Sequence, residues 1–437
     1  MTNVPMTRPE EALAIRETRY FHDSSFVELD DGRVMHSAQG LYSFSDDGGL
    51  TWSDDSRRHD RNGDPVGGDS SLVRLLGKGV GVGGRRINRG GKIGSFASVI
   101  FWRSEDGGET WEPPVQVSTP GVDTHAYQDV LLRTSSGRLI FPVYTGRSAT
   151  SVNVEKAPRP GKLVNGQWVG VGAHDFDPGF STVYVCYSDD DGRTWERNQD
   201  GDLFILLDWN ALYSYVNEPS VTEVVPGTLL MMMRVGLGRH FQAWSYDNGE
   251  SWTRPQPTAL ASSTTPCQIR TLPNGHLLMV WNQESESEIK QGYARTRLSS
   301  AISRNGGGVW EFFQNVESMH EATRVEPGPI RPTRPAELHY EPGFAAPERE
   351  REHIVSVGAH GRWSYPSAIV LQDRVIIAHT YSVLEEHPTE ARMFLSSRKG
   401  EGSINQKQKV LPLSWFYGGK EPADNPSLPR AHEPAQP

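Results

Sequence analysis

Cysteine is scarce in this sequence, and Cys186 and Cys267 are the only two among 437 residues. Two cysteines are too few for a disulfide scaffold and lack the ligand spacing of a zinc site, so both are expected to be buried thiols. Long hydrophobic runs are also lacking, and no segment has the length and apolarity of a transmembrane helix. The first residues show no apolar signal-peptide core, which favours a cytoplasmic location.

An excess of positive charge is lacking as well. Lysine and arginine total 44 residues against 54 aspartate and glutamate residues, a formal net charge of −10. Such a chain is not expected to bind nucleic acid or an anionic membrane surface as its main partner. An anionic small substrate is still compatible, because a few converging arginines outweigh the net charge locally. No cofactor is expected, and the oligomeric state stays open.

A short phrase that ends in tryptophan recurs along the chain. Its pattern is Ser-x-Asp-x-Gly-x-Thr-Trp, and the copies read SDDGGLTW, SEDGGETW, SDDDGRTW, SYDNGESW and, in degenerate form, SRNGGGVW. The copies begin at residues 45, 104, 188, 245 and 303, so successive starts are 59, 84, 57 and 58 residues apart. A period of about 60 residues with one large insertion is typical of a repeat architecture.

The residues of this phrase suit a hairpin turn. Aspartate can accept backbone N–H groups, glycine adopts positive φ angles, and tryptophan packs across the hairpin. A calcium loop of the EF-hand type is excluded, because the ligand positions and the closing glutamate are missing. Since an active site is not needed five times, we interpret the phrase as a structural turn in the outer part of each repeat.

A longer hairpin signal precedes each copy, in which two apolar β-type runs flank a tight turn. A sixth hairpin has no clear copy after it. The six hairpins cover residues 24–36, 70–83, 129–144, 220–234, 267–282 and 367–381. Six units of about four strands predict an all-β fold, a six-bladed β-propeller that forms one domain over residues 1–418. Residues 315–352 are expected to form an insertion between blades five and six, and the proline-rich residues 419–437 a flexible tail.

Polar residues gather where each hairpin's first strand begins and its second strand ends, which is one rim of a propeller. The starts offer His22, Asp23, Asp69, His125, Gln128, Asn217, Glu218, Thr265, Ser364 and Tyr365. The ends offer His36, Tyr144, Arg234, Asn282 and Tyr381. Because the strands between these positions are apolar, the asymmetry predicts a polar pocket at this rim.

The repeated phrase resembles the Asp-box, or BNR repeat, of the sialidase (neuraminidase) superfamily, whose members are six-bladed propellers. The likeness covers about residues 20–400 and is most specific in NEPSVTEVVPGTLLMMMR, YARTRLSSAIS and GRWSYPSAIVL. The Ser-Tyr-Pro context is most similar to the bacterial "predicted neuraminidase" branch. The resemblance implies that Tyr365 is the nucleophile and that Glu218 polarises it. It further implies that Arg234 and Arg295 bind a substrate carboxylate, with Arg297 as an alternative to Arg295.

These residue types suit chemistry on an anionic sugar. Arginine offers a planar, permanently charged fork to a carboxylate. A tyrosine beside a carboxylate base can act as the nucleophile, a known exception to the usual pair of carboxylates in glycosidases.

Two features of the family are missing from this sequence. The stretch that should carry the first arginine reads Phe21-His22-Asp23-Ser24, and the loop that should carry the acid/base aspartate is reduced to HSAQG at residues 36–40. The candidates for proton transfer are His22, Asp23, His36 and Asp69, among which the sequence does not choose. We group His22 and Asp23 with the catalytic residues. We group His125 and Asp69 with the residues that bind substrate.

The leading prediction is a sialidase-like glycoside hydrolase that acts on a terminal sugar bearing a carboxylate. A polysaccharide lyase that eliminates across uronic acid linkages, with tyrosine or histidine as base and acid, is the first alternative. A non-catalytic Asp-box propeller that binds glycans or another protein is the second. No metal is expected, because His22, Asp23, His36 and His125 lack tight ligand spacing. The sequence determines neither the sugar and its linkage nor the stereochemical course.

Overall fold

The computed structural model describes residues 11–425 and residue 431, with internal gaps. The gaps are 21–22, 69–70, 92–93, 149–160, 165–166, 171–178, 206–215, 291–292, 294, 332–359, 387–392 and 396–404. His22 and Asp69 therefore lie outside the described residues. So does the larger part of the predicted insertion at 315–352. The predicted tail is described only at residues 419–425 and 431.

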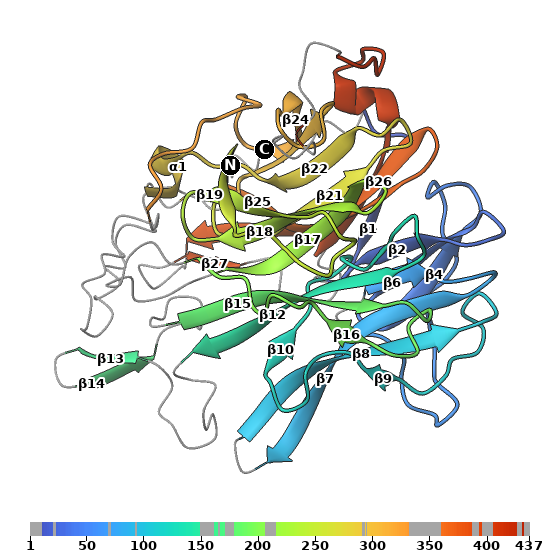
Figure 1. The fold of residues 1–437 in the computed structure, drawn as a ribbon. Coiled ribbons are helices and arrows are strands. Elements are labelled where there is room, and N and C mark those ends of the chain that lie inside the picture. The colour runs from blue at the N-terminus through green and yellow to red at the C-terminus, as the bar shows by residue number, and fades with distance from the viewer. Residues whose placement is uncertain are drawn as a thin grey trace, which may run out of the picture.

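The described residues form six β-sheets arranged around a ring, which confirms the predicted six-bladed propeller (Figure 1). Blade 1 contains β2 (Ser25–Glu28), β3 (Val34–Ala38), β4 (Leu41–Ser45) and β5 (Ser56–Arg57). Blade 2 contains β6 (Ser71–Arg74), β7 (Val80–Gly91), β8 (Gly94–Ser104) and β9 (Val115–Gln116). Blade 3 contains β10 (Thr124–His125) and β11 (Leu132–Arg133), which both pair with β12 (Leu139–Ser148), then β15 (Gly179–Ser188) and β16 (Glu196–Arg197).

The other three blades complete the ring. Blade 4 contains β17 (Val216–Val225), β18 (Thr228–Val235), β19 (Arg239–Ser245) and β20 (Gln256–Ala261). Blade 5 contains β21 (Cys267–Thr271), β22 (Leu277–Asn282), β23 (Arg297–Ser303) and β24 (Glu311–Ser318). Blade 6 contains β25 (His360–Val370), β26 (Arg374–Glu386), β28 (Gln406–Pro412) and β1 (Ala14–Thr18), with β27 (Met393–Leu395) beside the end of β26. The N-terminal strand thus supplies the outermost strand of the last blade and closes the ring.

Three shorter elements of the described chain lie outside the blades. They are the hairpin of β13 (Gly161–Val164) and β14 (Gln167–Gly170), the helix α1 (Glu286–Lys290) and the 3-10 helix η5 (Leu413–Tyr417). Within the described part of the chain, no helix has both the length and the apolarity to cross a membrane.

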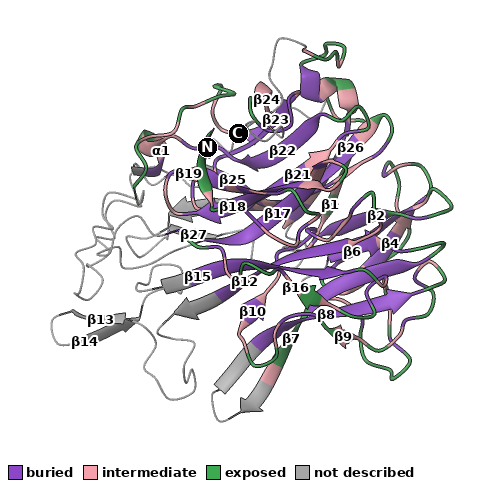
Figure 2. Ribbon diagram, viewed as in Figure 1, coloured by how far each residue is buried: buried purple, intermediate pink, exposed green. Residues whose placement is uncertain are grey.

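The core lies between neighbouring blades, and β18 shows why its sequence is a continuous apolar run. Met231 and Met233 pack with residues of blade 3, whereas Leu230 and Met232 pack with residues of blade 5. Successive side chains of a strand point to opposite faces, so a strand covered on both faces must be apolar at every position. Each such buried leucine or methionine stabilises the fold by about 1.5–3 kcal/mol. Figure 2 shows β18 and its neighbour β17 as mostly buried.

The repeated phrase forms the turn between the third and fourth strands of blades 1 to 5, as predicted. In the first copy, the Asp47 carboxylate accepts the Thr51 N–H at 2.9 Å and the Ser45 and Thr51 hydroxyls at 2.8 and 2.6 Å. The Gly49 N–H donates to Ser45 Oγ at 2.7 Å, and the Trp52 indole N–H donates to the Gly49 carbonyl at 3.1 Å. The same bonds recur in the next three copies. The interpretation as a structural turn is therefore confirmed.

The second glycine position of this turn also joins neighbouring blades, which the sequence did not predict. The five glycines are Gly49, Gly108, Gly192, Gly249 and Gly307, with φ angles of 86° to 99°. A Cβ at any of them would come within 3.0 Å of a buried side chain of the preceding blade. These glycines therefore combine a left-handed backbone with a close contact that no other residue type permits. Each turn closes its own hairpin and seals one interface between blades.

Blade 3 departs from its predicted hairpin over residues 129–144. The first half of this hairpin begins with Asp129 in a left-handed conformation, with φ of 58°, and only Leu132–Arg133 of that half pair as a strand. The backbone break turns the Asp129 carboxylate towards the centre of the ring, where it accepts hydrogen bonds from residues of blades 1 and 6.

The two cysteines, Cys186 and Cys267, are buried and free, as predicted.

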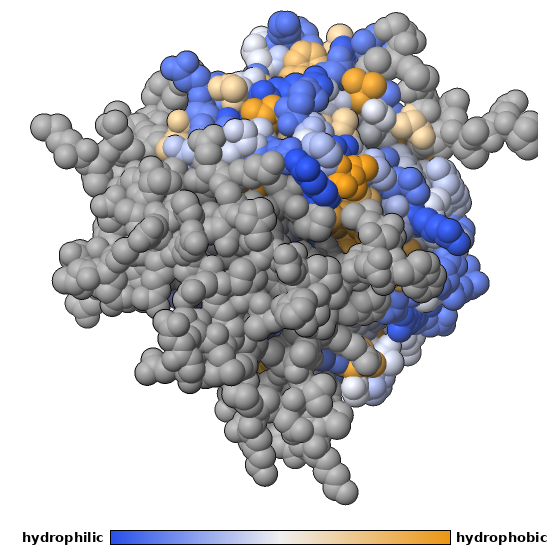
Figure 3. Space-filling view, turned by 90° about the vertical axis from the view of Figure 1, so that its left-hand side faces the viewer, coloured by the Kyte–Doolittle hydropathy of each residue, from blue (hydrophilic) through white to orange (hydrophobic). Residues whose placement is uncertain are grey.

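The surface in Figure 3 is mostly hydrophilic where it belongs to described residues, with apolar residues set singly or in small groups. The large apolar side chains exposed on the molecule, such as Leu13, Leu76 and Phe204, come from separate parts of the chain. Apolar residues exposed singly are normal for a protein surface.

Candidate active site

Three of the predicted site residues, each within an innermost strand or just before one, adopt a left-handed backbone conformation. They are Asp23 with φ of 72°, Glu218 with φ of 41° and Tyr365 with φ of 52°. In β17 and β25 the strand register slips by one residue at this point, so Glu218 and Tyr365 lie in β-bulges. Bulges redirect side chains, and left-handed residues of this kind cost about 1–3 kcal/mol and cluster at functional sites. The backbone therefore marks residues that the sequence singled out.

Glu218 forms an ion pair with Arg234, which lies opposite Asn217 on the neighbouring strand β18. The side chains of Arg234 and Glu218 are only 2% and 9% exposed. Burial, and then the positive charge of Arg234, lower the pKa of the adjacent His240 to about 4. His240 is thus neutral, and Arg234 is a fixed positive charge at this end of blade 4.

Arg295 lies over the ring of Tyr365, with its guanidinium carbon 4.8 Å from the ring centroid. A cation on an aromatic face is an attractive arrangement. Arg295 has a left-handed backbone, with φ of 65°, and its carbonyl accepts the Trp363 N–H at 2.8 Å. The loop before β23 is thereby fastened to β25 two residues before Tyr365.

Tyr127 of blade 3 lies close to Tyr365 and within electrostatic range of Glu218. Burial raises the pKa of Tyr127 well above its ordinary value, and the charges of Glu218 and then Tyr365 add to the shift. The rings of Tyr127 and Tyr365 are 6.2 Å apart. Four predicted site residues, Tyr365, Glu218, Arg234 and Arg295, thus come together from blades 4, 5 and 6.

Asp23 reaches the same group through its backbone. Its N–H donates to Gln128 Oε1 at 2.5 Å, and Gln128 Nε2 donates to the Tyr365 carbonyl at 3.0 Å. The predicted residues His22 and Asp69 fall in gaps of the description, so the structure gives them no position.

His125 lies on β10 in blade 3. Its Nε2 is 3.4 Å from Asp123 Oδ1, and its ring stacks on Tyr144 with the centroids 5.5 Å apart. The pKa of Asp123 is lowered, because its hydrogen bonds from His125 and from the Ala97 N–H outweigh the effect of burial. His125 is about one-quarter exposed and is oriented by these two neighbours.

His36 and Arg297, which the sequence offered as alternatives, have structural roles. His36 is 1% exposed and bonds the Ser24 hydroxyl at 2.6 Å inside blade 1, where burial lowers its pKa far below the ordinary value. Arg297 is also 1% exposed, and its guanidinium binds both carboxylate oxygens of Glu288 at 3.1 and 2.8 Å. Arg297 therefore anchors α1, and Arg295 is the arginine beside Tyr365.

Sequence reasoning missed several residues beneath this group. Tyr127, Asp129, Gln268 and Arg270 join Gln128 in a buried polar network around the axis. The only local sign of this network in the sequence is a charged residue in or beside an apolar run, as at Asp129 and Arg270. Among the described residues, no group of three His, Cys, Asp or Glu side chains is placed to hold a metal ion.

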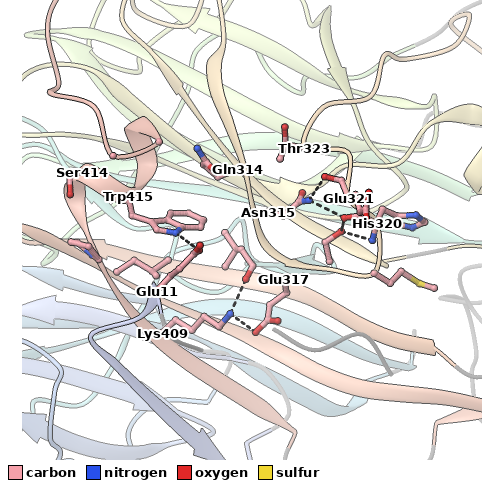
Figure 4. Close-up of a pocket in the computed structure, with 17 residues that line it drawn as sticks. Glu11, Gln314, Asn315, Glu317, His320, Glu321, Thr323, Lys409, Ser414 and Trp415 are labelled. Atoms are coloured by element: carbon pink, nitrogen blue, oxygen red, sulfur yellow. Dashed lines mark hydrogen bonds and ion pairs between the residues drawn. The ribbon is translucent and has the colours of Figure 1, made fainter. Parts of the chain in front are cut away.

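A separate polar cavity of about 870 Å³ lies between β24 of blade 5 and β28 of blade 6 (Figure 4). Lys409 and Glu317 form a buried ion pair there at 2.8 Å, and the Trp415 indole N–H donates to Glu11 at 2.7 Å. The described residues that line this cavity include none of the predicted site residues. The group around Tyr365 is thus a distinct site.

Comparison with known proteins gives a match to one family model, described as a BNR repeat-like domain, over residues 86–377. No curated protein sequence matches the chain.

Several solved structures share the fold. A Hadza microbial sialidase aligns with a TM-score of 0.52 and 15% identity over 93% of this chain and 67% of that chain. A point mutant of the NanB sialidase from Streptococcus pneumoniae aligns with a TM-score of 0.52 and 12% identity over 93% of this chain and 71% of that chain. A protein of unknown function from Dyadobacter fermentans aligns with a TM-score of 0.51 and 14% identity over 94% and 100%. At these identities the likeness is one of fold.

Proposed function

The chain belongs to the BNR repeat-like domain family of the sialidase superfamily, and from that premise we propose that it is a glycoside hydrolase. Its proposed substrate is a carbohydrate with a terminal sugar that bears a carboxylate. The observation that carries the proposal is that two pairs, the ion pair of Arg234 with Glu218 and the cation–π pair of Arg295 with Tyr365, lie around Tyr127. A nucleophile, a base and two carboxylate-binding groups are the parts that this reaction needs.

In the proposed reaction, the Tyr365 oxygen attacks the anomeric carbon while Glu218 accepts the phenol proton. The bond from the anomeric carbon to the leaving oxygen breaks, and that oxygen takes a proton from Asp23 or His22. Water then attacks the anomeric carbon and gives a proton to the group, Asp23 or His22, that protonated the leaving oxygen, while the sugar–tyrosine bond breaks and the phenol oxygen takes back its proton from Glu218. A phenol becomes negative only when its proton leaves, so it meets less repulsion from an anionic sugar than a carboxylate nucleophile does.

Arg234 and Arg295 would hold the carboxylate of the sugar. Both are permanently charged and present forked N–H donors that match a carboxylate in two bonds. Arg295 already lies on the ring of Tyr365, so a carboxylate bound to it would lie next to the reacting oxygen. Holding the substrate in this way lowers the entropic cost of reaching the transition state.

The test compares the wild-type protein with the Tyr365→Phe variant on fluorogenic sialosides and uronides. Removal of the phenol oxygen should lower turnover by roughly 10²–10⁴-fold, with folding unchanged. Tyr246→Phe is the matched control, because Tyr246 is 48% exposed and stacks on Trp244 in the outer part of blade 4. Undiminished turnover by Tyr365→Phe would rule out the nucleophile assignment.

The same assay separates the alternatives. A rise in ultraviolet absorbance from an unsaturated uronate, without hydrolysis, would identify a lyase. Binding of glycans without any turnover across the substrate panel would identify a non-catalytic propeller.

A further inference from the structure

Gln128 connects blades that are not neighbours in the ring. It precedes β11 in blade 3, which lies opposite blade 6 and is separated from blade 1 by blade 2. Its Oε1 nevertheless accepts the Asp23 N–H at 2.5 Å, and its Nε2 donates to the Tyr365 carbonyl at 3.0 Å. The side chain of Gln128, which is only 3% exposed, therefore spans the propeller axis.

Tyr127 holds the next peptide unit in the same way. Its hydroxyl donates to the Pro366 carbonyl at 2.8 Å. Two adjacent residues of blade 3 thus hold two successive carbonyls of blade 6. Proline has no N–H, so the peptide between Tyr365 and Pro366 can be fixed by hydrogen bonding only through the Tyr365 carbonyl. Gln128 provides that bond.

The position of Gln128 is itself fixed from below. Its backbone carbonyl accepts Gln268 Nε2 at 2.9 Å, and Gln268 Oε1 accepts the Ser220 hydroxyl at 3.1 Å. Ser220 follows Glu218 by two residues, on the same strand. One buried network therefore reaches the backbone of Tyr365 and the strand of Glu218 together.

The neighbouring ion pair completes the network. Asp129 accepts Arg270 Nη2 at 2.5 Å and the Ala368 N–H at 2.8 Å, and the Ser25 hydroxyl at 2.7 Å. Asp129 is 3% exposed. Hydrogen bonds in such a dry environment are strong and allow little movement.

We propose that Gln128 is a positioning residue that holds Tyr365 in its left-handed conformation and so aims the phenol at the substrate. A tyrosine with φ of 52° is disfavoured in isolation and persists only where its surroundings fix it. The bond from Gln128 Nε2 is the direct hold on the peptide that follows Tyr365. The functional part of this inference rests on the proposed role of Tyr365 as the nucleophile; the conformational part does not.

Two substitutions test it. Gln128→Leu removes both hydrogen bonds. Gln128→Glu keeps an acceptor for the Asp23 N–H but replaces the donor to the Tyr365 carbonyl with a carboxylate oxygen. Gln283→Leu is the matched control, because Gln283 is fully buried and bonds the Ser299 hydroxyl and the Thr323 carbonyl in blade 5. Thermal unfolding of all three variants verifies that each is folded. If Gln128→Leu does not fold, Gln128→Glu alone tests the proposal.

The first readout is a crystal structure of each folded variant, which needs no activity. We expect Tyr365 to leave the left-handed region in both Gln128 variants and to keep it in Gln283→Leu. A Tyr365 backbone unchanged in the Gln128 variants would overturn the proposal, whether or not the protein proves to be a glycosidase.

The second readout is the division of the effect between kcat and KM on the best fluorogenic substrate. We expect kcat to fall about 10²-fold in the Gln128 variants, because a misplacement of about 1 Å at the reacting atom has that effect. KM should stay within about twofold, because Arg234 and Arg295 still bind the carboxylate. An unchanged kcat, or an equal loss in Gln283→Leu, would overturn the positioning role. An inactive wild-type protein would instead refute the proposed function, and the crystal structures would then decide the conformational inference alone.

Discussion

Replacing Gly192 by alanine tests whether the repeated turn holds neighbouring blades together. Gly192 lies in the third copy of the turn with φ of 86°, and a Cβ there would lie 2.9 Å from Phe101 Cδ1 of blade 2 and closer still to Cε1. The Phe101 ring is fully buried between Gly81 and Trp195, whose ring centroid is 5.2 Å away, so it has no room to withdraw.

The expected loss of stability in Gly192→Ala has two parts, one from the backbone conformation and one from the steric clash. A left-handed alanine costs about 1–2 kcal/mol relative to glycine. Overpacking by one methyl group in a full core costs about 1–3 kcal/mol. We therefore expect Gly192→Ala to destabilise the protein by about 2–5 kcal/mol. Gly201→Ala separates the two parts, because Gly201 has φ of 81° in the same blade but no atom within 4 Å of its Cβ. That control should show only the conformational cost.

Urea unfolding followed by tryptophan fluorescence measures both variants. The midpoint should fall further for Gly192→Ala than for Gly201→Ala, with the slope of the free energy against urea unchanged. Equal losses of stability in the two variants would refute the steric clash between a Cβ at residue 192 and Phe101. Gly192 would then be required only for its positive φ angle.

Three further predictions concern the site and the turn. Arg234→Met leaves Glu218 as a buried unpaired carboxylate, so the free energy of unfolding should fall by about 3–5 kcal/mol. The double variant with Glu218→Gln should recover much of this loss. If the losses of the two single variants, measured by urea unfolding, simply add in the double variant, the two side chains do not stabilise the fold as a pair. Arg295→Lys keeps the charge but loses the fork, so KM for the carboxylated substrate should rise roughly tenfold with kcat little changed, and an unaltered KM would argue against carboxylate binding. Burial raises the pKa of Asp47, but hydrogen bonds from Thr51 and its neighbours outweigh this and bring it to about 2. Because the folded pKa is below the unfolded value of about 3.9, Asp47 stabilises the fold above that pH and the contribution disappears as pH falls towards 2. Unfolding midpoints of Asp47→Asn between pH 6 and 2 should therefore depend less on pH than those of the wild type, and parallel curves would contradict this.

Most of the propeller could be predicted because its repeated turn is a local structure. Asp47 bonds Thr51 four residues away, so the pattern that makes the turn is complete within one octet and marks every blade that has it. Blade 6 lacks the octet, and its outermost strand comes from the other end of the chain, where Ala14 pairs with Val410. No local pattern links two segments so far apart, so that closure could not be predicted.

In the candidate site, too, features set by neighbouring residues could be predicted from the sequence, whereas contacts between distant segments could not. Glu218 and Tyr365 each stand before a proline and a serine, which is a local signal for an irregular strand start. Gln128 and Arg270 act through partners far along the chain: Gln128 bonds Tyr365 across 237 residues, and Arg270 bonds Asp129 across 141. His36 shows the opposite failure, since a polar residue at a strand end suggested a rim position but proved to be buried within blade 1.

The bonds between Asp129 and Arg270 also determine how a polymer can approach the molecule. These side chains join blades 3 and 5 across the middle of the ring, with contacts of 2.5 and 2.6 Å, and leave no passage for a sugar chain between them. Under the proposed function, we therefore expect a glycan not to thread between blades 3 and 5 at this level of the axis. It would present a chain end to the rim or lie across it, and a released sugar would leave by the opening through which it entered. Processive sliding of a chain along the axis is thus not expected of this protein.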